Sequence, residues 1–128
     1  MRCRGIRGAI TVEHNTRESI LAATKELVQQ MIAANDMSVD DIAAVWFTTT
    51  SDLNAEFPAV AARELGLSKT ALLCGHEMDV PGSLPSCLRV MMLVNTEKKN
   101  DELIYVYLKG AEALREETNN IQTGGNKT

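Results

Sequence analysis

The first segment of the chain alternates between two sets of side chains. Over residues 2–12, Ile6 and Ile10 share one side of the chain and Arg7 lies on the other. A period of two residues is typical of a β-strand. Gly8 lies within the same run and would let a ligand or another backbone approach closely. The pattern therefore predicts a strand with a close contact on one side.

Two later segments have helical features. Asn15 followed by Glu18 resembles a capping box, and apolar residues then recur at intervals of three and four. We therefore expect a helix over residues 16–35. Pro58 suits the first position of a second, shorter helix, and Gly66 provides its stop.

Four more segments have the apolar, β-branched composition of strands, at residues 42–50, 70–74, 87–96 and 104–108. Strands separated by two helices predict an α+β domain with a mixed β-sheet and both helices on one face. Because the strands are apolar on both sides, the opposite face of the sheet also needs a cover. Another copy of the chain would provide it, so we expect a homo-oligomer.

The length of 128 residues fits one domain, which we assign to residues 1–116. The segment 117–128 is too polar to fold by itself, and we expect a flexible C-terminal tail. One hypothesis is that this tail covers the occupied site, as mobile chain ends near active sites often do.

The charge and the cysteines narrow the class of protein. A formal net charge of -4 argues against a nucleic-acid partner, which requires a clustered basic surface. Cys3, Cys74 and Cys87 are odd in number and show no CxxC spacing, so a reduced, cytoplasmic environment fits best. The N-terminus lacks the apolar core of a signal peptide, and no segment approaches the roughly 18 apolar residues of a membrane span.

Three charged residues lie in unusual surroundings. Arg89 interrupts an apolar run, so its guanidinium needs a partner, which is a bound anion, a structural ion pair or solvent at a sheet edge. Glu77 lies between two apolar strands, where it would bind a ligand hydroxyl, pair with an arginine, or simply face water. Arg7, beside Gly8, faces either an anion or solvent.

The sequence gives little support for a metal site or a catalytic nucleophile. Cys74, His76, Glu77 and Cys87 are of metal-binding types, but their spacing matches no known ligand pattern. A cysteine and a histidine two positions apart rarely meet with catalytic geometry. We therefore expect neither a metal nor a cofactor.

Five motifs together resemble the AroH class of chorismate mutases over residues 4–115. They are R-G-I-R-G-A at 4–9, F-P-A-x-A-x-R-E-L at 57–65, C-x-x-E-M-D-V at 74–80, C-L-R-V-M-M at 87–92 and V-Y-L at 106–108. The resemblance implies a homotrimer with a barrel-like core and active sites in the clefts between neighbours. It also implies the intramolecular rearrangement of chorismate, a dianion, to prephenate in aromatic amino-acid synthesis.

The same resemblance assigns roles to individual residues. Arg89 is implied to lie beside the ether oxygen of the substrate, Glu77 and Cys74 to hold the ring hydroxyl, and Arg7 and Tyr107 to contact a carboxylate. The further residues implied to line or close the pocket are Phe57, Ala59, Arg63, Leu73, Met78, Leu114 and Arg115. Leu73 and Val60 depart from one known member of the family, which has a threonine and a lysine there, so the pocket edge and its charge are expected to differ.

Two other functions stay open at this point. One is another trimeric α+β enzyme, such as an imine or enamine hydrolase, in which Arg89 binds a substrate carboxylate. The other is a regulatory module that senses an anionic metabolite between subunits without any chemistry. A likeness of fold alone does not separate them from a mutase.

Overall fold

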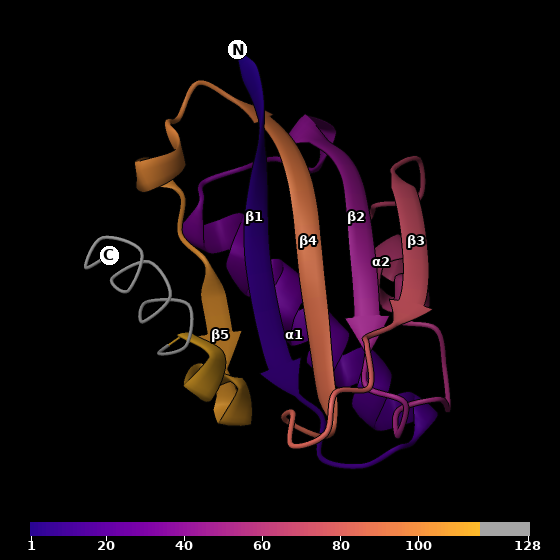
Figure 1. Cartoon of the computed structure of the whole chain (residues 1–128). Helices are drawn as coiled ribbons and strands as arrows, with labels where there is room; N and C mark the ends of the chain where they lie inside the picture. Colours follow the sequence, from indigo (N-terminus) through magenta and orange to yellow (C-terminus); the bar gives the residue numbers. More distant parts are fainter. Residues whose placement is uncertain (116–128) are drawn as a thin grey trace, which may run out of the picture.

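The computed structural model describes residues 1–115, and the predicted tail at 117–128 lies outside the described residues. Five strands form one sheet in the order β3-β2-β4-β1-β5, with both helices behind it (Figure 1). The helices are α1 (Arg17–Ala34) and α2 (Ala59–Glu64). The strands are β1 (Arg2–Thr11), β2 (Ile42–Thr49), β3 (Ala71–His76), β4 (Cys87–Thr96) and β5 (Val106–Leu108).

The sheet is mixed, as the sequence predicts. The central strand β4 runs antiparallel to both of its neighbours, β1 and β2, whereas the edge strands β3 and β5 run parallel to theirs. Because β4 is central, the interpretation of Arg89 as an edge-strand residue is wrong. None of the described helices has the length and apolar character that crossing a bilayer would require.

The predicted strand at 104–108 is shorter in the structure, because a side chain replaces strand pairing at its start. The Asn35 side chain accepts a hydrogen bond from the Ile104 amide at 2.8 Å and donates one to the Ile104 carbonyl at 2.9 Å. β5 therefore begins only at Val106.

The predicted capping box at the start of α1 is also wrong. Thr16 is the N-cap, and its hydroxyl accepts a hydrogen bond from the Ser19 amide at 3.1 Å. The side chain of Asn15 instead accepts hydrogen bonds from the amides of Asn54 and Ala55. Asn15 thus fastens the chain before α1 to the loop that precedes α2.

The core lies between the helices and the sheet, and Gly8 sets how closely they approach. Ile6 and Ile10 of β1 are fully buried, as are Leu27 and Met31 of α1. A Cβ atom at Gly8 would lie 2.5 Å from the Met31 sulfur and 3.2 Å from a methyl carbon of Leu27. The close contact predicted at Gly8 is therefore made by helix α1.

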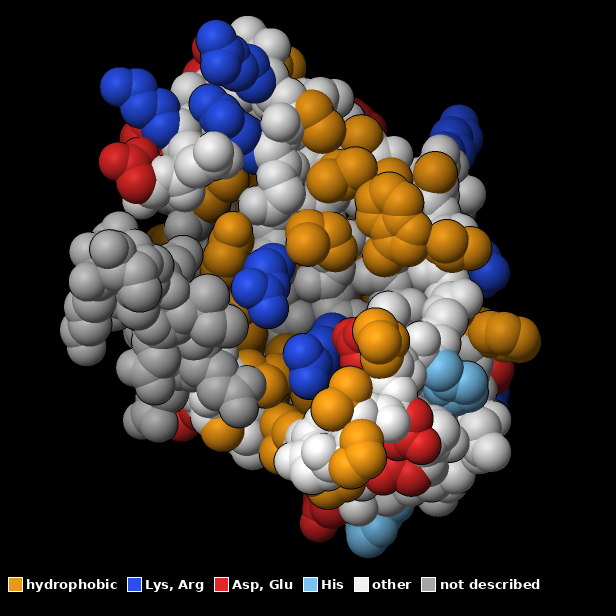
Figure 2. Space-filling view, in the orientation of Figure 1, with side chains coloured by type: hydrophobic (Ala, Val, Ile, Leu, Met, Phe, Trp, Pro, Cys, Tyr) orange, Lys and Arg blue, Asp and Glu red, His pale blue; other side chains and the backbone are white. Residues whose placement is uncertain are grey.

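The other face of the sheet is covered only at its β5 side, where Ala111 and Leu114 pack on Ala9 and Tyr107, and its β2 and β3 side stays open within residues 1–115. Trp46 of β2 pairs with Met91 of β4 and Leu73 of β3, and the three are 41%, 38% and 59% exposed. Figure 2 shows this open face, with charged side chains near its middle and hydrophobic side chains around them. It is the face that the sequence predicts to need a cover.

We predict that Gly8→Ala lowers the free energy of unfolding by about 1–3 kcal/mol, because the new methyl group overpacks the contact with Met31. Chemical denaturation measures this change. Gly75→Ala is the matched control, since a Cβ there has open space. Equal stability of the two variants would contradict this account of the helix–sheet contact.

Candidate active site

The charged residues singled out in the sequence meet in one hollow of the open face. It has a volume of about 180 Å³. Register explains the convergence, since Ala9 pairs with both Arg89 and Tyr107, and Thr48 also pairs with Arg89. Paired residues point to the same face of a sheet. The lining residues are Arg7, Gly8, Ala9, Trp46, Thr48, Glu77, Arg89, Val90, Met91, Tyr107 and Leu114.

Arg89 is the centre of this cavity. Its Nε atom is buried and has no hydrogen-bond partner among residues 1–115, and the nearest carboxylate oxygen, Oε2 of Glu77, is 3.8 Å away. A buried donor on a charged group costs free energy unless it finds an acceptor. The guanidinium is therefore suited to an acceptor supplied by a ligand in the cavity.

Glu77 follows the last residue of β3 and is fixed at both backbone and side chain. Its amide donates to the Thr49 carbonyl at 2.8 Å. Its carboxylate accepts from the Thr48 hydroxyl at 3.1 Å through Oε2 and from the Met78 amide at 3.3 Å through Oε1. The alternative that Glu77 simply faces water is therefore wrong, because its carboxylate is an oriented acceptor beside Arg89.

Two aromatic residues accompany the arginines at the β5 side of the cavity. The guanidinium carbon of Arg7 lies 6.0 Å from the centre of the Tyr105 ring, and that of Arg115 lies 5.7 Å from the Tyr107 ring. Both distances are within reach of a cation–π attraction. With two lining arginines and one carboxylate, the cavity carries a net positive charge that suits an anion.

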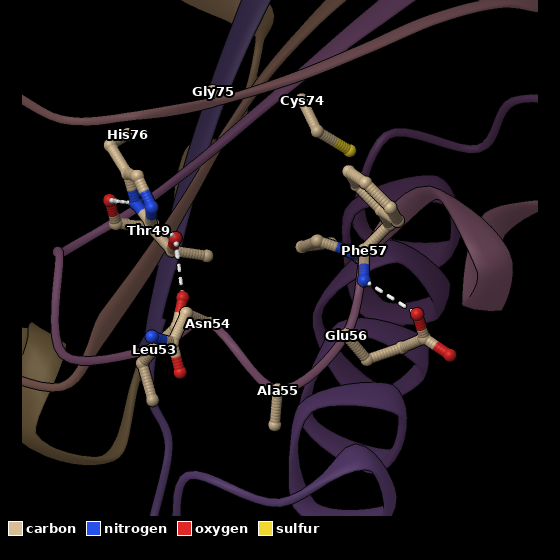
Figure 3. A pocket seen from close by; sticks show the side chains of 10 residues that line it. Thr49, Leu53, Asn54, Ala55, Glu56, Phe57, Cys74, Gly75 and His76 are labelled. Carbon is tan, nitrogen blue, oxygen red and sulfur yellow. Dashed lines mark hydrogen bonds between the residues drawn. The ribbon is translucent and has the colours of Figure 1, made fainter.

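Other predicted pocket residues lie elsewhere in the protomer. Cys74 pairs with the buried Phe47, so it points to the helix side of the sheet, whereas Arg89 lies on the open face. Figure 3 shows Cys74 directed toward the ring of Phe57, across a second cavity of about 370 Å³ from His76. Within one protomer, Cys74 and Glu77 therefore line different cavities.

The remaining predicted pocket residues are dispersed over the protomer. Leu114 lines the Arg89 cavity, and Leu73 is exposed on the open face. Ala59 is buried in α2, where Arg63 is exposed on the surface. Met78 is also exposed, in the loop after β3.

The cysteines do not have the electrostatics of nucleophiles. Burial raises the pKa of the Cys74 thiol, although the Ala59 amide and the Arg63 charge oppose this change. Burial likewise raises the pKa of Cys87, which the charge of Arg89 offsets only in part. A reactive cysteine needs a lowered pKa. Among residues 1–115, no three metal-binding side chains converge on a common point.

A hydrogen-bonded clasp, which sequence reasoning missed, fixes the start of β4. Asp52 accepts from the amide of Ser86 at 3.0 Å and from its hydroxyl at 3.3 Å. Thr50 donates to Asp52 and accepts from the Cys87 amide at 3.0 Å. Ser86 has a φ of 51°, a left-handed conformation uncommon for serine. The clasp thus stabilises an unfavourable turn just before the strand that carries Arg89.

Fold and cavity define an α+β protein whose open sheet face has a positively charged cavity suited to a small anion, and neither Cys74 nor Cys87 has a lowered pKa. Comparison with known sequences places it further: the sequence model of the family described as "Chorismate mutase type I" matches residues 3–118. The chain therefore belongs to the type I chorismate mutases and is an isomerase. The resemblance predicted from the motifs is confirmed.

Two characterised relatives are similar over most of the chain. Chorismate mutase AroH of Thermus thermophilus is 48% identical over 120 residues, which cover 93% of this chain and 98% of that protein. Chorismate mutase AroH of Bacillus subtilis (strain 168) is 45% identical over 116 residues, covering 90% and 91%.

A solved structure agrees with the fold. Chorismate mutase from Clostridium thermocellum superposes with a TM-score of 0.85 at 50% sequence identity, covering 86% of this chain and 98% of that one. The predicted α+β class is confirmed. The family assignment sets aside the hydrolase and the regulatory module that the sequence left open.

We predict that the clasp makes stability depend on pH in the acid range. The hydrogen bond from Thr50 is the largest of the effects that hold the pKa of Asp52 below its ordinary value. The stabilisation is complete above the pKa of the unfolded chain, about 3.9, and is lost as the pH falls through the lower pKa of the folded state.

Thermal unfolding of the wild type and Asp52→Asn measures this dependence. The variant should unfold at a lower temperature at pH 7, and the difference should shrink below about pH 4. Asp40→Asn, at an exposed position in the turn before β2, is the control. If the difference in unfolding temperature between the wild type and Asp52→Asn stays constant down to pH 2.5, the carboxylate is not its source.

Proposed function

We propose that this isomerase, which converts chorismate to prephenate, does so in clefts between subunits, and that Arg89 stabilises the ether oxygen that departs. The observation that carries the proposal is the buried Nε of Arg89, which has no acceptor within residues 1–115 and lies in one cavity with Arg7, Glu77 and Tyr107.

The reaction requires placed charges and a fixed conformation. A C–O bond breaks as a C–C bond forms within one molecule, and no proton moves in that step. The enzyme therefore needs to hold the enolpyruvyl arm over the ring and to stabilise the charge that develops on the ether oxygen. Arginine suits the second task, because its planar group stays charged and its donors have a fixed geometry.

The other residues of the cavity orient the substrate. Arg7 and Tyr107 bind a carboxylate of the dianion, and Glu77 accepts a hydrogen bond from the ring hydroxyl. The positive cavity favours the dianion, while the carboxylate of Glu77, fixed by Thr48 and Met78, selects the orientation in which the hydroxyl faces it.

A second subunit completes the site. The Arg89 cavity, at about 180 Å³, is smaller than the roughly 300 Å³ at which ligand pockets usually begin. The second cavity contains Phe57 and Cys74, next to the helix that bears Ala59 and Arg63. We infer that this region of one subunit closes over the Arg89 cavity of its neighbour, so that Cys74 meets the substrate from across the interface.

The exposed apolar face supports the assembly. Trp46, Met91 and Leu73 lie side by side on it, and burying them against another subunit gives a favourable hydrophobic contribution. The number of three subunits around a barrel-like core, as well as the closing roles of Met78, Leu114 and Arg115, rests on the family resemblance.

We also propose the setting in which the enzyme works. Residues 1–116 form one catalytic domain that acts in the cytoplasm, where its three free cysteines stay reduced. The net charge of -4 gives no reason to expect a nucleic-acid partner. The concerted rearrangement described above needs no metal or cofactor, because one bond forms as the other breaks.

We predict that Arg89→Ala lowers kcat by about 10²–10³ or more, because it removes a preorganised donor at the oxygen where charge develops. The loss of the diene absorbance of chorismate measures the rate. Arg2→Ala, at the exposed start of β1, should retain wild-type turnover. Near-normal kcat for Arg89→Ala, in a protein of unchanged assembly, would refute the assignment.

We predict that Trp46→Glu dissociates the assembly, because a charge replaces a large apolar side chain on the open face. Light scattering after size-exclusion chromatography should give a trimer for the wild type and a monomer for the variant. Ile104→Glu, at a comparably exposed apolar residue outside the strands, should remain assembled. A monomeric wild type would overturn the shared site.

A further inference from the structure

One carboxylate oxygen in the cavity has two neighbours of different kinds. Oε2 of Glu77 accepts a hydrogen bond from the Thr48 hydroxyl at 3.1 Å and lies 3.8 Å from Nε of Arg89. A hydrogen bond between an arginine and a carboxylate normally has a length of about 2.7–2.9 Å. The ion pair is therefore too long to be a hydrogen bond, whereas the bond to Thr48 is formed.

Strand β2 fixes the position of this carboxylate. Thr48 is paired with Arg89 across the β2–β4 register, so both side chains rise from the same face of the sheet. The next residue, Thr49, binds the backbone of Glu77 through its carbonyl at 2.8 Å. Two successive residues of β2 thus hold the backbone and the side chain of Glu77 beside Arg89.

The hydrogen bond from Thr48 affects whether Glu77 binds Arg89. The buried Nε of Arg89 has no acceptor within residues 1–115, and Glu77 is the carboxylate closest to it. A carboxylate released from Thr48 would gain by moving to this donor, because the buried Nε–H lacks an acceptor and a bond between opposite charges adds their Coulomb attraction. The guanidinium would then be engaged by Glu77 and less available to a substrate oxygen.

We propose that Thr48 is a positioning residue that holds Glu77 away from Arg89 and so keeps the guanidinium available. The proposal rests on the function proposed above, in which Arg89 acts on the ether oxygen. Thr48 acts through Glu77. Its hydroxyl, rather than its size, is the feature that matters, and this makes the role separable from packing in β2.

Two substitutions separate the hydroxyl from the packing. Thr48→Val keeps the shape and the β-branched side chain but removes the donor, and Thr48→Ser keeps the donor and removes a methyl group. We expect Thr48→Val to lower kcat roughly tenfold or more, with a smaller change in KM, because the interaction lost acts mainly in the transition state. Thr48→Ser should retain kcat within about twofold, and both variants should unfold near the wild-type temperature.

The same substitution in a Glu77→Ala protein tests whether Thr48 acts through Glu77. In Glu77→Ala protein there is no carboxylate for Thr48 to restrain, so adding Thr48→Val should lower kcat much less than it does in the wild type. Equal losses in the two backgrounds would overturn the proposal, as would a Thr48→Ser protein impaired as strongly as Thr48→Val. An unchanged kcat in Thr48→Val would do so as well.

A spectroscopic measurement gives an answer that does not depend on turnover. The ¹H–¹⁵N signal of the Arg89 Nε–H group, assigned by its loss in Arg89→Lys, should move downfield in Thr48→Val as a hydrogen bond to Glu77 forms. It should stay in place in Thr48→Ser. An unmoved signal in Thr48→Val refutes the role of Thr48, whereas a wild-type protein that fails to consume chorismate refutes the proposed function and leaves the signal to decide on Thr48.

Discussion

The structure depends on a guanidinium placed in the central strand of the sheet. Arg89 has strands on both sides, so its backbone is fixed by two ladders and its Nε atom is shielded from water. A charge in such a place is unfavourable unless nearby groups or a ligand compensate it. Glu77, which β2 holds 3.8 Å from the guanidinium, provides partial compensation and leaves the Nε donor for a ligand to satisfy.

The two faces of the sheet have different roles: one stabilises the subunit and the other forms the candidate site. The helix side carries the core, where the absence of a side chain at Gly8 lets α1 pack closely on β1. The open side carries the charged hollow and, around it, apolar residues such as Trp46 and Met91. Because both the candidate site and the proposed interface occupy one face, a subunit contact that covers the apolar residues would also exclude water from the arginines.

Periodicity predicted most of the fold, and side-chain contacts over long sequence distances account for the errors. The strands and helices were predicted because residues such as Ile6 and Ile10 repeat with the period of their element. The start predicted for the last strand was wrong because Asn35, 69 residues away, binds Ile104. The central place of Arg89 was equally hidden, since strand order follows from pairing and not from composition. Thr48 was missed because its importance depends on that register.

The sequence predicts that Cys74 and Glu77 point to opposite faces of the sheet, but only if the end of β3 is placed correctly. Residues three apart in a strand point to opposite faces, and β3 extends to His76, directly before Glu77. The two residues therefore approach a common ligand only if another subunit presents the cysteine. The alternation that builds the core thus places Cys74 and Glu77 on opposite faces of one sheet, and the site that we propose would join them only across two chains.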